Sequence, residues 1–373
     1  MSRRSGIRCE TLSQLSSADR APVTGWSGYS RWTKARREEE QDAMITFEHV
    51  SKTYPGGVEA VKDLSLEVEK GETLVLLGTS GSGKTTSMKM VNRLIEPTEG
   101  RILVNGNDIM GQDPIELRRR IGYAIQHIGL FPHMTVGENI GVVPRLLKWD
   151  DAKITDRVDT MLNMVGLDPE DFRDRFPNQL SGGQKQRIGV ARSLAADPEI
   201  ILMDEPFGAL DPITREELQN EFLELESEIR KTILFVTHDV FEAVKMGDRI
   251  ALLDDGRLQQ IATPGELVEN PANEFVDRFL GQHRFQLSLL TTTVRGIIES
   301  CKVEQEARGT PPDRPPDNRL RFSNSLIEAL DVFKQTGAAE LPVYRGNQYK
   351  GSLSQKTLLN AMTRVLGEAG ADT

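Results

Sequence analysis

The sequence has few of the residues that mark extracellular or membrane-spanning chains. Only two of its 373 residues are cysteines, Cys9 and Cys301, which excludes a disulfide scaffold and a multi-cysteine zinc site. We find no apolar run near the ~20 residues of a spanning helix, and the mean hydropathy is −0.39. The net charge of −10 argues against a broad nucleic-acid surface. We therefore expect a globular chain in a reducing compartment, with no nucleic acid as partner and any membrane role supplied by another subunit.

The first 43 residues differ from the rest. They are rich in serine and arginine and show neither helical nor strand periodicity. They also lack the apolar stretch of ~7–15 residues that a secretory signal contains. Three interpretations stay open: translation that begins at Met44, a disordered extension, or a basic segment around Trp32 that touches anionic lipid.

From Met44 onward the pattern predicts an α/β fold. Residues 45–50 and 64–68 alternate in polarity as strands do, whereas three continuous apolar runs are typical of strands buried on both faces. Helical segments separate these runs, which favours a mostly parallel sheet. The stretch from about residue 130 to about residue 180 is expected to form an inserted helical subdomain. The three buried strands are expected at 73–77, 200–203 and 232–236.

A phosphate-binding loop follows the first of these apolar strands. Residues 78–85 read G-T-S-G-S-G-K-T, which matches G-x-x-x-x-G-K-[ST] between a predicted strand and a predicted helix. The glycines let successive N–H groups point at phosphate oxygens, and the helix adds its positive end. Lys84 is expected to contact the β- and γ-phosphates, and the Thr85 hydroxyl is expected to ligate Mg²⁺.

Two adjacent carboxylates, Asp204 and Glu205, end the second buried strand. A carboxylate at a strand tip beside a phosphate loop can hold Mg²⁺, which assigns Asp204. Glu205 is then left to polarise the attacking water.

Five ordered motifs give the chain its family resemblance. The segment L-S-G-G-Q ends at Gln184, and together with the phosphate loop, Asp204-Glu205, Ala209-Leu-Asp211 and His238 it resembles the ATP-binding cassette (ABC) ATPases over residues 44–281. The resemblance implies a P-loop cassette with a mostly parallel core sheet, an antiparallel N-terminal sheet and an inserted helical subdomain. It also implies a head-to-tail homodimer that encloses two ATP molecules.

The resemblance assigns further site residues one by one. Tyr54 resembles the aromatic that stacks on adenine, Gln126 the glutamine that touches the metal or the water, and His238 the γ-phosphate switch histidine. Ser181 to Gln184 would face the partner's phosphate loop, and Asp211 would contact the opposite subunit. The catalytic set is Lys84, Gln126, Glu205 and His238, and the metal ligands are Thr85, Gln126 and Asp204. The ATP-binding set is Tyr54, Gly78, Thr79, Ser80, Gly81, Ser82, Gly83, Lys84, Thr85, Thr86, Ser181, Gly182, Gly183, Gln184 and Asp211.

One cassette without long coiled coils or spanning helices favours the separate ATPase of a bacterial importer, on the cytoplasmic face of the membrane. Residues 126–136 look like the segment where transmembrane permease subunits dock. The run from Tyr123 to Pro132 is most similar to the quaternary-amine branch, whose complexes take up glycine betaine, choline, carnitine or proline betaine from an extracytoplasmic solute-binding protein. An importer for another solute, such as an amino acid or a sulfonate, and a regulatory nucleotide-binding module remain as alternatives.

The C-terminal part supports the same branch. Residues 322–367 look like one cystathionine-β-synthase-type (CBS) repeat, with helix–strand–turn–strand–helix over 326–366. Residues 282–321, with four prolines between 311 and 316, are expected to be a linker or a degenerate first repeat. No aspartate follows Ser354, so a structural or dimerising module is favoured over a nucleotide sensor.

Overall fold

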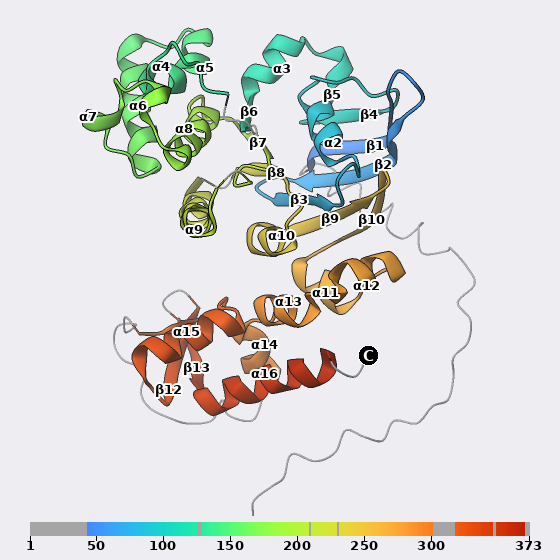
Figure 1. Ribbon diagram of the computed structural model, residues 1–373, viewed down its shortest axis with the longest axis vertical. Coiled ribbons are helices and arrows are strands. Elements are labelled where there is room, and N and C mark those ends of the chain that lie inside the picture. Colours follow the sequence, from blue (N-terminus) through green and yellow to red (C-terminus); the bar gives the residue numbers. More distant parts are fainter. Residues whose placement is uncertain are drawn as a thin grey trace, which may run out of the picture. The chain divides into compact units, whose positions relative to one another are not determined.

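The computed structural model describes residues 43–124, 129–208, 210–229, 231–300, 318–345 and 348–369. Within this part of the chain, three β-sheets are surrounded by helices (Figure 1). In these residues no helix combines the length and the apolar character that a membrane crossing requires.

The central sheet positions the site. Its six strands lie in the order β10-β9-β3-β8-β7-β6, and all neighbours are parallel except β9 and β10. Because the carboxyl ends of parallel strands share one edge, the loops after β3, β7 and β8 meet there. The strands are β3 (Thr73–Gly78), β6 (Ile121–Ala124), β7 (Ile200–Asp204), β8 (Thr232–Val236), β9 (Arg249–Asp254) and β10 (Arg257–Ala262).

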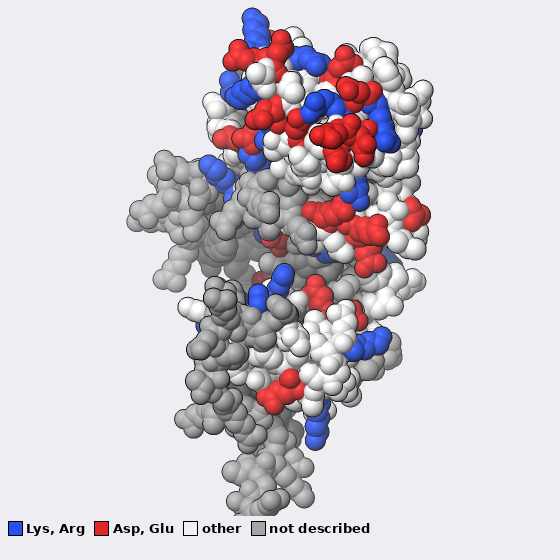
Figure 2. Space-filling view, turned by 90° about the vertical axis from the view of Figure 1, so that its left-hand side faces the viewer, with Lys and Arg blue, Asp and Glu red and all other residues white. Residues whose placement is uncertain are grey.

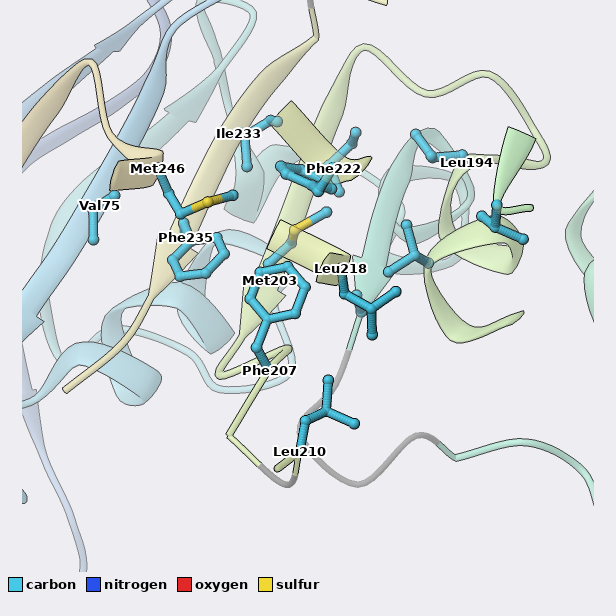
Figure 3. Packing of buried hydrophobic residues seen from close by; sticks show 14 of the residues in the cluster. Val75, Leu194, Met203, Phe207, Leu210, Leu218, Phe222, Ile233, Phe235 and Met246 are labelled. Atoms are coloured by element: carbon cyan, nitrogen blue, oxygen red, sulfur yellow. The ribbon is translucent and has the colours of Figure 1, made fainter. Parts of the chain in front are cut away.

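Every residue of β3, β7 and β8 is buried, as their continuous apolar runs predict. Phe207 packs between Phe222 and Phe235 on one side of the sheet, with ring centroids 6.3 and 6.1 Å apart (Figure 3). Phe207 belongs to the loop that follows Asp204 and Glu205, so this cluster anchors the loop that carries the two carboxylates. The helices that cover the sheet are α2 (Lys84–Val91), α8 (Gly182–Leu194), α9 (Pro212–Ile229) and α10 (Val240–Met246).

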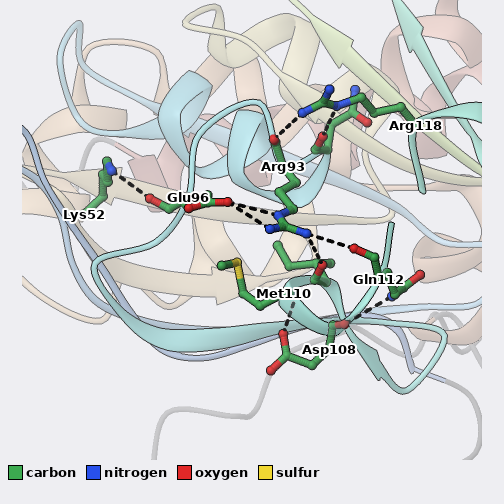
Figure 4. Close-up of polar contacts among 9 residues, drawn as sticks. Lys52, Arg93, Glu96, Asp108, Met110, Gln112 and Arg118 are labelled. Carbon is green, nitrogen blue, oxygen red and sulfur yellow. Dashed lines mark hydrogen bonds and ion pairs between the residues drawn. The ribbon is translucent and has the colours of Figure 1, made fainter. Parts of the chain in front are cut away.

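The expected antiparallel sheet lies beside the central one, in the order β2-β1-β4-β5. Arg93, two residues after the end of α2, donates to the carbonyls of Ile109 and Gln112 and pairs with Glu96, while Arg118 donates to the carbonyl of Arg93 (Figure 4). These bonds fix the end of the phosphate-loop helix against the following segment. The elements here are β1 (Ala43–Thr53), β2 (Glu59–Glu69), β4 (Glu99–Val104), β5 (Asn107–Asp108), η1 (Ile109–Gly111) and α3 (Pro114–Arg120).

The helical stretch expected at about 130–180 is present. Its elements are α4 (Val136–Ile140), α5 (Val142–Leu146), α6 (Asp151–Met164), α7 (Pro169–Phe172) and η2 (Pro177–Gln179). The buried residues of α6 follow helical spacing, at Ile154, Val158, Met161 and Leu162.

Carboxylates gather on the upper part of the face in Figure 2, with basic groups between them, which fits the chain's net negative charge.

The C-terminal unit has the predicted order of helix, two strands and helix. Two further helices occupy residues 284–300, a stretch for which the sequence predicts a linker or a degenerate repeat. Leu287 is fully buried in the cassette core, whereas Leu289, Val294 and Ile297 belong to the C-terminal core. The elements are α11 (Pro264–Glu269), α12 (Glu274–Gly281), α13 (Arg284–Thr291), α14 (Val294–Ser300), β11 (Leu320–Arg321), α15 (Leu326–Thr336), β12 (Glu340–Arg345), β13 (Gln348–Ser354) and α16 (Gln355–Ala369).

Candidate active site

The phosphate loop is built on glycines that no other residue could replace without strain. Gly78, Gly81 and Gly83 have φ angles of 152°, 81° and 94°, a region that L-residues rarely adopt. A Cβ on Gly78 would overlap the carbonyl oxygen of Leu253, and one on Gly83 would overlap that of Ala60, whereas Gly81 has open space around it. The loop is therefore held in its curled form by close approach to two neighbouring strands.

Lys84 lies under this loop, with only 6% of its surface exposed. Its ammonium group donates to the carbonyls of Gly78 and Thr79, at 2.9 and 2.7 Å, and to the Ser82 hydroxyl at 3.3 Å. Burial lowers the pKa of Lys84, and the carboxylates of Glu205 and Asp204 act in the opposite direction. The cation is thus held at the place where phosphate oxygens would lie, as the motif predicts.

Thr85 and Asp204 form the expected metal-binding pair. The Thr85 hydroxyl donates to the Asp204 carboxylate at 3.0 Å. Burial raises the pKa of Asp204, while the bond from Thr85 and the nearby Lys89 lower it. One hydroxyl and one carboxylate beside a phosphate cradle are the hard oxygen ligands that Mg²⁺ takes from proteins, with phosphates and waters completing its shell. The residues present therefore fit a magnesium ion.

Glu205 and His238 come together from different loops. Nδ1 of His238 lies 3.1 Å from Oε1 of Glu205. Glu205 has a positive φ of 46°, a strained conformation for a residue with a side chain, and its amide donates to the carbonyl of Val236 at 3.0 Å. Strain of this kind at the end of a buried strand is typical of functional sites.

A cavity of about 600 Å³ joins these groups. It brings together Lys84 and Thr85 with Glu205 and His238, which are more than 100 residues away in sequence. Tyr54 reaches the same region, since its hydroxyl lies 3.3 Å from that of Thr86. The lining residues are Ala60, Ser80, Gly81, Ser82, Gly83, Lys84, Thr85, Thr86, Glu205 and His238.

The L-S-G-G-Q segment does not line this cavity in the same chain. Ser181 begins α8 with a capping box: its hydroxyl accepts from the amide of Gln184, whose side chain accepts from the amide of Ser181. Ser181 and Gly182 are exposed. Asp211 is also exposed, and the bonds that it receives from Thr214 lower its pKa.

Gln126 lies outside the described residues, as does Ala209. Two contributors to the site were not predicted. Ala60 presents its backbone to Gly83, and Asp254 accepts from the Thr79 hydroxyl at 3.0 Å. Neither Ala60 nor Asp254 belongs to a motif. Asp254 could have been predicted only from the pairing of β9 with β3.

Comparisons with known proteins agree with this geometry. The sequence profile of the ABC transporter family matches residues 61–208. The carnitine transport ATP-binding protein OpuCA of Listeria monocytogenes is 59% identical over 339 residues, covering 86% of this chain and 85% of that protein. The choline transport ATP-binding protein OpuBA of Bacillus subtilis is 56% identical over 326 residues, with 87% and 85% covered.

Among solved structures, the dimeric ATP-binding cassette MJ0796, in a post-hydrolysis state with ADP and Pi, has a TM-score of 0.54 and 36% identity. The match covers 59% of this chain and 98% of the MJ0796 chain. The fold and the site define an ABC-type ATPase. The chain belongs to the family of ABC transporter ATP-binding subunits of quaternary-amine osmoprotectant importers. Its members bind ATP, work with membrane permease subunits and couple hydrolysis to transport.

Proposed function

We propose that this subunit powers the uptake of a quaternary ammonium compound, such as glycine betaine, carnitine or choline. The cavity in which the phosphate loop, Glu205 and His238 meet supports ATP hydrolysis as the energy source, and the identities of 59% and 56% to carnitine and choline transport proteins support the kind of solute. Because the solute binds other subunits, the relatives rather than the cavity support its chemical class.

The described residues divide the catalytic work among them. The loop amides and Lys84 hold the phosphates and offset the charge that develops on them. Glu205 polarises the attacking water, and His238, 3.1 Å away, orients Glu205 and contacts the γ-phosphate. Thr85 and Asp204, with Gln126, would hold Mg²⁺, which supplies charge neutralisation between the β- and γ-phosphates.

A second copy of the chain completes the site in this proposal. The Ser181–Gln184 segment, in which Ser181 and Gly182 are exposed, begins α8, and the N-terminus of a helix attracts anions. It would bind the γ-phosphate held by the partner's loop, while Asp211 would contact the opposite subunit. Two ATP molecules would then lie between the two cassettes of a homodimer.

The complex also includes membrane and extracytoplasmic proteins. Permease subunits would dock near residues 126–136, where Phe131 is 41% exposed, and a solute-binding protein would deliver the compound from outside. The chain would act at the cytoplasmic face of the bacterial plasma membrane. Its C-terminal CBS-like unit would serve as a structural or dimerising module.

The substitution Glu205→Gln tests the catalytic assignment. We expect the variant to bind ATP and to accumulate an ATP-bound dimer, with hydrolysis reduced on the order of 10²- to 10⁴-fold because the water loses its base. ATP turnover and dimer formation by size-exclusion chromatography are the measurements. Glu217→Gln, which removes the same charge from an exposed position of α9, is the matched control. Full turnover by Glu205→Gln would contradict the assignment.

A further inference from the structure

Glu242 is a buried carboxylate that the proposed mechanism leaves without a role. It lies in the first turn of α10 and is 7% exposed. Burial raises the pKa of Glu242, whereas bonds from Thr237 and Gln219 and the nearby Arg215 guanidinium lower it. Ionising a buried carboxylic acid costs free energy. Such an acid between two loops of the site is therefore a candidate for a functional role.

The first link of Glu242 is to the segment that carries His238. The Asp239 side chain accepts from the amide of Glu242 at 3.3 Å, and the Asp239 amide donates to the Thr237 hydroxyl at 3.0 Å. Hydrogen bonding from the Thr237 side chain also lowers the pKa of the Glu242 carboxylate. The amide of Thr237 in turn donates to the carbonyl of Leu76 in β3 at 3.2 Å. Hydrogen bonds therefore fix the backbone on both sides of His238, and Thr237, the partner of Glu242, takes part in both of them.

The second link of Glu242 is to α9, which follows the loop between Glu205 and Asp211. The side-chain amide of Gln219 donates to Oε1 of Glu242 at 3.1 Å, and Gln219 is as buried as Glu242. Arg215, one turn earlier on α9, donates to the carbonyl of Leu210 at 2.9 Å. One carboxylate thus connects the N-terminal half of α9 with the residue next to His238.

We infer that Glu242 is a positioning residue for hydrolysis, which fixes His238 relative to Glu205 and joins the His238 segment to the Asp211 loop. It does not line the cavity of the phosphate loop, and it acts through Thr237. The inference rests on the proposed roles of Glu205 and His238. Its consequence is a loss of turnover rather than of ATP binding when the carboxylate is removed, since the phosphate loop and Lys84 are untouched.

The test uses the full-length protein assembled with its membrane subunits, with kcat, the KM for ATP and the thermal midpoint measured for each variant. Glu242→Gln keeps the volume but removes the charge, and Thr237→Val removes the hydroxyl at constant shape. We expect each to lower kcat by about tenfold or more while KM changes by less than about threefold. The double variant should be no slower than the slower single variant, because both changes break one linkage. Thr237→Ser, which keeps the hydroxyl, should restore turnover.

Glu72→Gln is the matched control. Glu72 is also 7% exposed, burial also raises its pKa, and it contacts Arg249 away from the cavity. Glu72→Gln is expected to change the thermal midpoint without lowering kcat. If Glu242→Gln keeps the wild-type kcat while His238→Ala is inactive, the inference about Glu242 is overturned and the proposed role of His238 stands. Equal falls of kcat in Glu242→Gln and Glu72→Gln would also overturn it, since a structural effect would then suffice. Full turnover by His238→Ala would overturn both the inference and the proposed role of His238.

Discussion

Replacement of two glycines in the phosphate loop separates backbone strain from steric overlap. Gly81 and Gly83 have similar positive φ angles, 81° and 94°. A Cβ on Gly81 would meet nothing within 4 Å, whereas a Cβ on Gly83 would overlap the carbonyl oxygen of Ala60 and lie 3.2 Å from a methyl group of Val61. Alanine at Gly81 therefore introduces strain alone, and alanine at Gly83 introduces strain and a collision with β2.

The magnitudes follow from these two situations. Left-handed backbone costs an L-residue about 1–2 kcal/mol, and the smaller entropy of the unfolded alanine chain returns about 0.4–1 kcal/mol. Gly81→Ala should therefore lower the free energy of unfolding by about 1 kcal/mol. Overpacking adds about 1–3 kcal/mol at Gly83, because the Ala60 oxygen is backbone and cannot rotate away.

The assay is thermal unfolding of the full-length protein without nucleotide. A difference of 1 kcal/mol shifts the midpoint by roughly 2–4 °C in a domain of this size, so Gly83→Ala should unfold at least about 2 °C below Gly81→Ala. Isothermal titration with ATP should show the larger loss of affinity in Gly83→Ala as well, since Ala60 lines the cavity. Equal midpoints, or a lower midpoint for Gly81→Ala, would show that the Ala60 carbonyl does not oppose a side chain at position 83.

Two further predictions concern the metal pair and the cassette boundary. Thr85→Val removes the hydroxyl that bonds Asp204, so the Mg²⁺ concentration for half-maximal hydrolysis should rise about tenfold or more; an unchanged magnesium titration would contradict the assignment of Thr85. Leu287→Ala should lower the free energy of unfolding by about 2–5 kcal/mol, because Leu287 is fully buried in the cassette core. The control Leu359→Ala, at a position 45% exposed, should change the free energy of unfolding little. Equal losses for the two variants in chemical denaturation would place the cassette boundary before Leu287.

The parts of the fold that local physics determines could be predicted from the sequence. The apolar runs of β3, β7 and β8 have no polar face, so only a sheet covered on both sides accommodates them. The phosphate loop was equally predictable, because its glycines and Lys84 form one continuous segment between a strand and a helix.

Contacts between distant segments could not be predicted in this way. The pairing of Glu205 with His238 depends on β7 lying beside β8, and a residue-by-residue pattern contains no such information. Leu287 shows the same limit: its segment has a plain composition beside a proline-rich stretch, and only the packing assigns it to the cassette core. Glu242 carries no motif, and its importance follows from two partners that lie 23 and 5 residues before it in the chain.

Hydrolysis at Glu205 is proposed to drive the uptake of a quaternary ammonium compound. This coupling is tested by the uptake of radiolabelled glycine betaine at high external osmolarity. Cells would express this subunit with its membrane and solute-binding partners, carrying the native residue, Glu205→Gln or the control Glu217→Gln. We expect uptake with the native protein and with Glu217→Gln, and none with Glu205→Gln at equal protein level. Uptake that persists in Glu205→Gln would show that hydrolysis at Glu205 does not drive transport.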